Sequence, residues 1–161
     1  MEKIAVFPGS FDPFTIGHES VLQRALPIFD KIIVMLGVNE NKKTLFSAEK
    51  RKQMIEDLFN NEPKVEVRIH DGLTIDFCKS VEATHILRGL RTSADFEYER
   101  AIAQVNKKMY DHIETIFLLT LPEHTPVTSS VVRDILNHNG DISIFIPKNL
   151  DIKKYLGNEN D

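Results

Sequence analysis

Short apolar runs alternate with longer amphipathic segments along the whole chain, and this alternation constrains the fold more than any other feature. The run at 31–38 is almost continuously apolar, as in a strand buried on both faces. The segments between such runs repeat apolar residues at helical spacing. A strand–helix alternation of this kind predicts a mostly parallel sheet. We therefore expect an α/β, Rossmann-like, doubly wound fold with a five-stranded parallel sheet and helices on both faces.

The expected elements cover nearly all of the 161 residues, and no repeat or low-complexity segment interrupts them. The predicted strands lie at 3–8, 31–38, 64–69, 85–89 and 114–121. The predicted helices lie at 17–29, 47–60, 73–82, 94–110 and 128–137, and Pro147 is expected to open a last one. The length predicts a single domain, 1–161, with disorder expected only at 157–161.

Charge and composition exclude several classes of protein. The formal net charge of −4 argues against nucleic acid as a partner, because nucleic-acid binding usually needs a basic face. No apolar run approaches the roughly 20 residues that cross a bilayer, so no membrane partner is expected. No signal peptide precedes the first strand, which predicts a cytoplasmic protein. The only cysteine, Cys78, cannot form an intrachain disulfide and is expected in the core.

An apolar stripe follows one side of the predicted 94–110 helix. Tyr98, Ile102, Val105 and Met109 recur there at helical spacing. We interpret this stripe as part of the core or of a subunit contact rather than as a ligand cage.

The first polar motif directly follows the first strand. Residues 8–18 read Pro-Gly-Ser-Phe-Asp-Pro-Phe-Thr-Ile-Gly-His. Gly17 allows close approach of a ligand or of another backbone. His18 falls in the first turn of the next helix, where free N–H groups and the helix dipole attract anions. Since this dipole disfavours imidazolium, we expect a neutral His18 that donates an N–H when no phosphate is bound.

Two further motifs lie after later strands. Residues 127–133 read Val-Thr-Ser-Ser-Val-Val-Arg and open a helix, where hydroxyls and backbone N–H groups form a second anion cradle. Residues 86–99 place Arg88 and Arg91 around a strand end, and a guanidinium there can grip phosphate oxygens through two bonds. A Gly-x4-Gly-Lys-Ser/Thr stretch is absent, which excludes the common P-loop alternative.

These motifs resemble those of known nucleotidyltransferases. The Thr-x-Gly-His turn between a first strand and a first helix resembles the hallmark of that superfamily. The Arg-Gly-Leu-Arg stretch followed by Asp-Phe-Glu-Tyr-Glu resembles the phosphopantetheine adenylyltransferase family, as do Pro-Gly-Ser-Phe-Asp-Pro at 8–13 and the lysine loop at 41–43. The resemblance runs from Lys3 to about Leu150. It implies transfer of an adenylyl group from ATP to 4′-phosphopantetheine, giving dephospho-coenzyme A and pyrophosphate.

The resemblance also implies roles for individual residues. His18 would stabilise the transition state at the α-phosphate, with Lys42 and Arg91 as further catalytic groups. The acceptor would be bound by Ser10, Lys42, Thr74 and Arg88. The ATP site would comprise Ser10, Phe11, His18, Gly89, Leu90, Arg91, Glu99, His124, Thr125, Pro126, Val127, Thr128, Ser129 and Ser130.

An acceptor that is a phosphate monoester is already charged near −1.5 to −2 at pH 7, so no general base is required. No His/Cys/Asp/Glu cluster has zinc spacing, and the expected metal is Mg²⁺ held mainly by phosphates.

The family resemblance implies a homohexamer and inhibition by the product or coenzyme A. The alternatives are another nucleotidyltransferase of this superfamily, such as one using nicotinamide mononucleotide, or a non-catalytic ATP-binding sensor.

Overall fold

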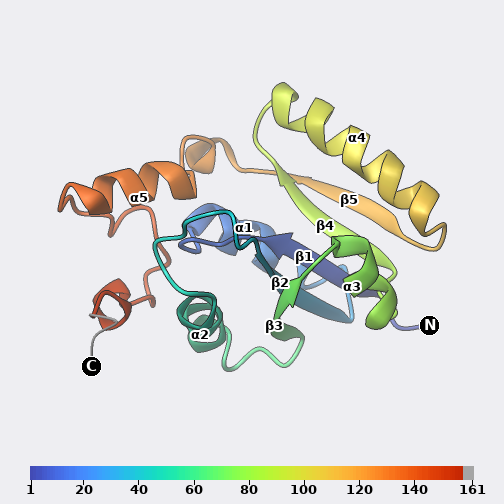
Figure 1. The fold of residues 1–161 in the computed structure, drawn as a ribbon, viewed down its shortest axis with the longest axis horizontal. Coiled ribbons are helices and arrows are strands. Elements are labelled where there is room, and N and C mark those ends of the chain that lie inside the picture. Colours follow the sequence, from blue (N-terminus) through green and yellow to red (C-terminus); the bar gives the residue numbers. More distant parts are fainter. Residues whose placement is uncertain (158–161) are drawn as a thin grey trace.

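A five-stranded parallel sheet forms the centre of the molecule, in the order β3-β2-β1-β4-β5 (Figure 1). The computed structural model describes residues 1–157. The strands are β1 (Ile4–Gly9), β2 (Lys31–Val38), β3 (Val65–Asp71), β4 (His85–Leu90) and β5 (Glu114–Leu119). This arrangement confirms the predicted doubly wound α/β fold, because helices connect the parallel strands on both faces of the sheet.

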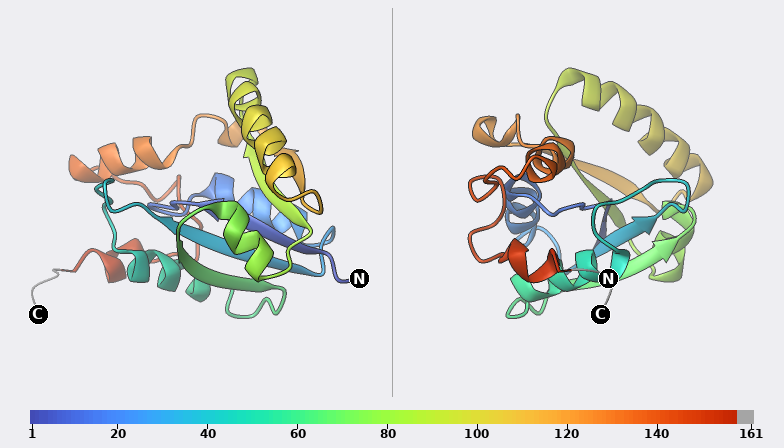
Figure 2. Two further views of the ribbon diagram at one scale, coloured as in Figure 1. Left: turned by 45° about the vertical axis from the view of Figure 1, so that its right-hand side comes forward. Right: turned by 60° about the vertical axis from the view of Figure 1, so that its left-hand side comes forward.

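The two faces of the sheet are covered by different helices (Figure 2). The helices are α1 (Ile16–Ala25), α2 (Ala48–Leu58), α3 (Thr74–Ser80), α4 (Ser93–Met109) and α5 (Ser129–Asn137), with short 3-10 helices η1 (Pro122–His124) and η2 (Ile152–Tyr155). Successive side chains of β1 point to opposite faces. Ala5 and Phe7 therefore pack with α1 and α2, whereas Val6 packs with α3.

A third apolar cluster lies beyond the carboxyl ends of the strands. Val132 of α5 packs there with Phe46 and Met54, and the C-terminal segment adds Ile146 and Tyr155. The cluster includes residues of both α5 and α2, and α5 lies to one side of the sheet rather than over either face (Figure 1). The start of α5 consequently faces the edge at which the strands end.

The strand order changes direction between β1 and β4, which are neighbours although β2 and β3 separate them in sequence. In open parallel sheets such a switch point creates a crevice beyond the carboxyl ends of the strands. The motifs after β1 and β4 both lie at this edge, as the sequence predicts.

Two expectations are wrong in detail. The helix predicted to reach Phe29 ends at Ala25. Pro147 begins a turn in which the Leu150 N–H donates to the Pro147 carbonyl at 3.0 Å. Within residues 1–157, the only helical structure after this turn is the four-residue η2.

Exposure of Tyr98 at 69% and of Val105 at 55% excludes the stripe on α4 from the core of this chain, so a subunit contact stays a prediction. Tyr98, Ile102 and Met109 of the stripe also line a cavity between α3 and α4, which the sequence did not predict.

Cys78 is fully buried, as expected for a core residue. Most of the predicted tail, 158–161, lies outside the described residues. Among the helices of residues 1–157, none combines the length and the apolar character that a bilayer crossing requires.

Candidate functional site

The turn after β1 is held in shape by close packing and by a helix cap. Phe11 has a left-handed backbone with φ of 48°, and its ring lies where a Cβ at Gly9 would come within 2.9 Å. Only glycine leaves room for that ring. Thr15 then caps α1, with its hydroxyl accepting the His18 N–H at 3.4 Å. The turn therefore delivers His18 into the first turn of α1 in a fixed position.

The imidazole of His18 belongs to the cap itself. Its Nδ1 accepts the backbone N–H of Thr15 at 3.0 Å, which leaves the ring proton on Nε2. The ring is surrounded by aromatic side chains, with Phe11 at 4.9 Å and Phe14 at 5.4 Å between ring centroids. Burial, followed by the positive charges of Arg88 and Arg91, lowers the pKa of His18 to about 4. The structure thus supports a neutral Nε2–H donor, with desolvation as the largest cause.

The second anion cradle lies against the first. Thr128 caps α5 by accepting the Val131 N–H at 3.2 Å. The Ser129 hydroxyl donates to the Pro13 carbonyl at 2.9 Å, across 116 positions of sequence. Arg133 donates to the Asp12 carbonyl at 2.9 Å. The two helix starts that the sequence singles out therefore meet over one cleft.

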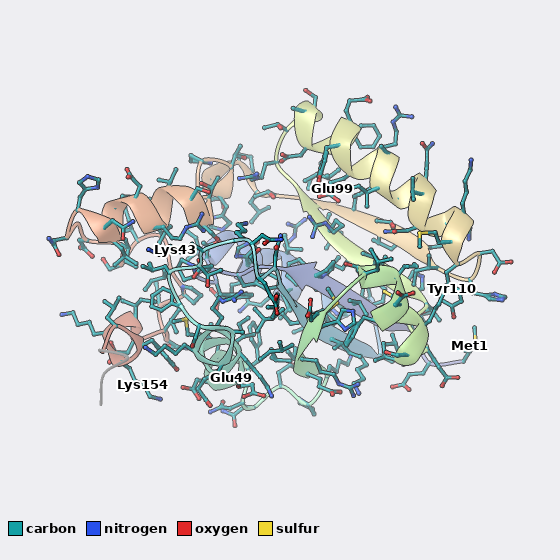
Figure 3. The ribbon with its side chains drawn as sticks, in the orientation of Figure 1. Met1, Lys43, Glu49, Glu99, Tyr110 and Lys154 are labelled. Atoms are coloured by element: carbon teal, nitrogen blue, oxygen red, sulfur yellow. The ribbon has the colours of Figure 1, made fainter. Side chains whose placement is uncertain are left out.

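Arg88 lies where β4 reaches this cleft, and its guanidinium is fixed on two sides. Two of its nitrogens donate to the carboxylate of Glu99, from Nε at 3.0 Å and from Nη2 at 2.5 Å. Nη1 donates to the Pro8 carbonyl at 2.6 Å. Glu99 is only 8% exposed and lies on the side of α4 that faces the sheet (Figure 3). Since a guanidinium has five N–H donors, two remain for a ligand.

Two adjoining cavities open from this edge of the sheet. The first, of about 340 Å³, contains His18, Arg91 and the start of α5. The second, of about 500 Å³, runs between α3 and α4. Ser10, Lys42 and Arg88 line both cavities, together with Pro8, Gly9 and Glu99. A group held by these shared residues would contact ligands in either cavity.

Most of the predicted site residues lie together in these cavities. The first cavity is lined by Ser10, Phe11, His18, Lys42, Arg88, Gly89, Arg91, Glu99, His124, Val127, Thr128, Ser129 and Ser130. Thr74 lines the second. Leu90, Thr125 and Pro126 line neither cavity, and Leu90 is buried. Phe11 is also 3% exposed, so its side chain packs on His18 rather than offering a broad surface to a ligand.

Several residues at the site were not among the predicted ones. Asp95 and Arg133 line the first cavity. Asp95 accepts from Arg91 at 3.3 Å and completes the cap of α4, a signal visible as Thr-x-x-Asp in the sequence. Arg133 ends the Thr-Ser-Ser-Val-Val-Arg motif, and its position one turn after the hydroxyls could have identified it. The carboxylate of Glu99, which was predicted to contact ATP, instead accepts hydrogen bonds from Arg88.

The charges in the cleft favour an anionic ligand. Lys42, Arg88, Arg91 and Arg133 line the first cavity, against the two carboxylates of Asp95 and Glu99. Within residues 1–157, no three His, Cys, Asp or Glu side chains are grouped so as to hold a metal ion. A Mg²⁺ ion at this site would therefore have to take most of its ligands from phosphate oxygens and water.

We predict that the His18 ring stays neutral far below the usual range of histidine. Its NMR titration should have a midpoint near pH 4, with the signal assigned by its loss in His18→Gln. Between about pH 4 and pH 6.5 the unfolded chain binds more protons at this site, so the free energy of unfolding should rise with pH across that window. A midpoint near 6.5 would contradict the structural account.

Comparisons with known proteins agree with this site. The cytidylyltransferase-like family model matches residues 6–135. A phosphopantetheine adenylyltransferase of Bacteroides thetaiotaomicron is 54% identical over 148 residues, covering 92% of this chain and 97% of that protein. One of Flavobacterium johnsoniae is 51% identical over 150 residues, covering 93% and 98%.

A solved structure shares the fold at much lower identity. The putative nicotinate-nucleotide adenylyltransferase of Vibrio parahaemolyticus superposes with a TM-score of 0.66 at 18% identity, covering 92% of this chain and 90% of that one. At this identity the match supports the Rossmann-like fold and no substrate. The family model and the relatives at about half identity decide the matter: the chain belongs to the cytidylyltransferase-like family and, within it, to the phosphopantetheine adenylyltransferase family.

Proposed function

We propose that the protein transfers the adenylyl group of ATP to 4′-phosphopantetheine, giving dephospho-coenzyme A and pyrophosphate. The observation that carries this proposal is the meeting of two cavities at Ser10, Lys42 and Arg88. The first cavity has the cations and helix starts that suit a triphosphate. The second suits the acceptor, and the shared residues suit the phosphate that must attack.

The chemistry needs positioning more than it needs a base. An oxygen of the acceptor phosphate attacks the α-phosphorus of ATP in line, and the bond from that phosphorus to the β-bridging oxygen breaks. Pyrophosphate leaves with the electron pair. Lys42 and Arg88 would hold the attacking phosphate, which reduces the repulsion between two anions. Such positioning can contribute about 7–11 kcal/mol.

His18 would stabilise the charge that develops on the α-phosphate. Its Nε2–H is available because Nδ1 is occupied by the Thr15 N–H. A single well-aimed donor of this kind contributes roughly 3–4 kcal/mol.

Arg91 and the Ser130 hydroxyl, which accepts from Arg133 and keeps its own proton free, would bind the β- and γ-phosphates. The Ser129 hydroxyl already donates to the Pro13 carbonyl, so Ser129 would contribute through its backbone N–H at the start of α5.

The second cavity suits a mostly apolar arm with a few polar groups. Leu73, Ile75 and Ile102 contribute apolar lining, while Thr74 and Asn106 contribute polar atoms. Pantetheine alternates short aliphatic stretches with amides, so this mixture matches it. A Mg²⁺ ion bound with the nucleotide would neutralise part of the triphosphate charge.

Release of pyrophosphate from ATP on addition of 4′-phosphopantetheine tests the proposed reaction. Nicotinamide mononucleotide in place of the acceptor tests the alternative nucleotidyltransferase. ATP binding without pyrophosphate release, with either acceptor, would identify a non-catalytic sensor and refute the proposal.

We further propose that the protein works in the cytoplasm as a homohexamer, inhibited by coenzyme A. The exposed apolar stripe on α4 supports burial in an assembly, since Tyr98 and Val105 are 69% and 55% exposed in the single chain. Sedimentation should give about six times the chain mass of 18.4 kDa. A monomer at micromolar concentration would contradict the hexamer.

Replacing His18 by Ala should lower kcat by about two orders of magnitude or more and leave the affinity for ATP within several-fold. The lost Nε2–H acts on charge that appears only in the transition state. Steady-state kinetics and equilibrium ATP binding measure the two effects. His138→Ala removes an exposed histidine of α5's C-terminus and should change neither. A near-normal kcat in His18→Ala would remove this residue from the mechanism.

Replacing Arg88 by Ala should raise KM for 4′-phosphopantetheine more than KM for ATP, by about tenfold or more, since charged hydrogen bonds contribute roughly 1.5–3 kcal/mol. The change also leaves the Glu99 carboxylate buried without its partner. Arg88→Ala with Glu99→Gln corrects for this, and its acceptor KM should remain high. Arg100→Ala, which removes an exposed arginine of α4, is the control. An unchanged acceptor KM would make Arg88 purely structural.

A further inference from the structure

Asp12 is a buried carboxylate that the reaction above does not use. It is 2% exposed and lines neither cavity. Its two oxygens accept backbone N–H groups from a distant segment, Oδ2 from Leu45 at 2.8 Å and Oδ1 from Phe46 at 2.9 Å. Hydrogen bonds to a charged acceptor are stronger than neutral ones, so this is a firm attachment between the β1 turn and the segment before α2.

Asp12 binds the last residues of the loop between β2 and α2, which contains the lysines at 42 and 43. Lys42 lies only three residues before Leu45, in a stretch whose residues 40–43 are exposed. The loop passes in front of the sheet edge, where Lys43 marks it in Figure 3. Phe46, by contrast, is 3% exposed and sits in the third apolar cluster. The loop thus changes from exposed to buried at the two amides that Asp12 binds.

Arg51 of α2 holds the same segment through its carbonyl. Its Nε donates to the Phe46 carbonyl at 3.0 Å, and Nη1 donates to the Ser10 carbonyl at 2.6 Å. Arg51 is only 3% exposed. Asp12 and Arg51 therefore tie the loop to the turn that bears Ser10, one through N–H groups and the other through carbonyls.

The same turn is also tied to α5. Arg133 donates from Nη1 to the Asp12 carbonyl at 2.9 Å, and the same nitrogen lies 4.0 Å from the carboxylate. Its Nη2 donates to the Ser130 hydroxyl at 3.2 Å. Asp12 is thus the point at which the β1 turn, the lysine loop and the second anion cradle are joined.

We propose that Asp12 is a positioning residue that places Lys42 at the junction of the two cavities. This inference rests on the proposed function, in which Lys42 binds the acceptor phosphate. A loop ordered during folding does not have to be ordered on binding, so the attachment should strengthen acceptor binding. Without it, Lys42 keeps its charge but loses its fixed place.

Asp12→Asn tests the proposal with little change of shape. The amide NH₂ would face one of the two backbone N–H groups, and that hydrogen bond would be lost. We expect KM for 4′-phosphopantetheine to rise about tenfold while KM for ATP stays within about threefold. In a Lys42→Ala background the same change should raise the acceptor KM less than twofold, because contacts that act through one another are not additive. Asp30→Asn, which loses a carboxylate that accepts the Lys3 N–H at 2.8 Å, is the matched control.

Equal rises in both KM values, or full additivity with Lys42→Ala, would overturn the assignment. Hydrogen exchange provides a second readout: the Leu45 and Phe46 amides should exchange at least tenfold faster in Asp12→Asn, with β1 and β2 unchanged. If Asp12→Asn does not fold, Arg51→Lys should give the same selective rise in acceptor KM, and its absence would overturn the proposal.

Wild-type turnover separates the two levels of inference. If the wild type releases no pyrophosphate, the proposed function fails. The role of Asp12 is then tested by hydrogen exchange alone. Unchanged protection of the Leu45 and Phe46 amides in Asp12→Asn would overturn its role in holding the loop.

Discussion

The ion pair between Arg88 and Glu99 is the constraint on which the site depends. It joins α4 to the carboxyl edge of β4, and the third contact of the guanidinium, to the Pro8 carbonyl, joins β4 to β1. The pair therefore spans the switch point of the sheet. Arg88 and Glu99 line both cavities, so the side chains that join these elements also line the junction between the cavities. Burial of Glu99 keeps the guanidinium in place before any phosphate arrives.

The site concentrates positive charge in a protein whose net charge is −4. Cations from β4, α5 and the lysine loop converge at one edge, and two helix starts add their N–H groups. Low polarity around His18 excludes a further positive charge, so the ring remains a neutral donor. Permanently charged side chains thus attract an anionic ligand, whereas the neutral imidazole of His18 offers a single N–H donor in a fixed place.

The fold and much of the site could be predicted because their signals are local. Apolar runs identified the strands, and polar motifs just after them identified the turns that meet in the cleft. One error came from tertiary contacts, since the segment after Pro147 forms a turn that packs with residues of α2 and α5. Helical spacing on α4 could not show whether its stripe meets the core or another subunit, and the exposure of the stripe excludes the core. Asp12 and Arg51 act across 33 to 41 positions, which no local pattern reveals. The pairing of Glu99 with Arg88 spans only 11 positions, but it runs from a strand to the next helix, so no strand or helix spacing reveals it.

The sharing of Ser10, Lys42 and Arg88 between two cavities has a consequence for inhibitor design. A compound that extends through the junction would lose its translational and rotational freedom only once, whereas two separate fragments lose it twice. Its linker would have to be short and anionic at the centre, to match the basic side chains there. The architecture thus favours one elongated, doubly anchored molecule over a pair of compact ones.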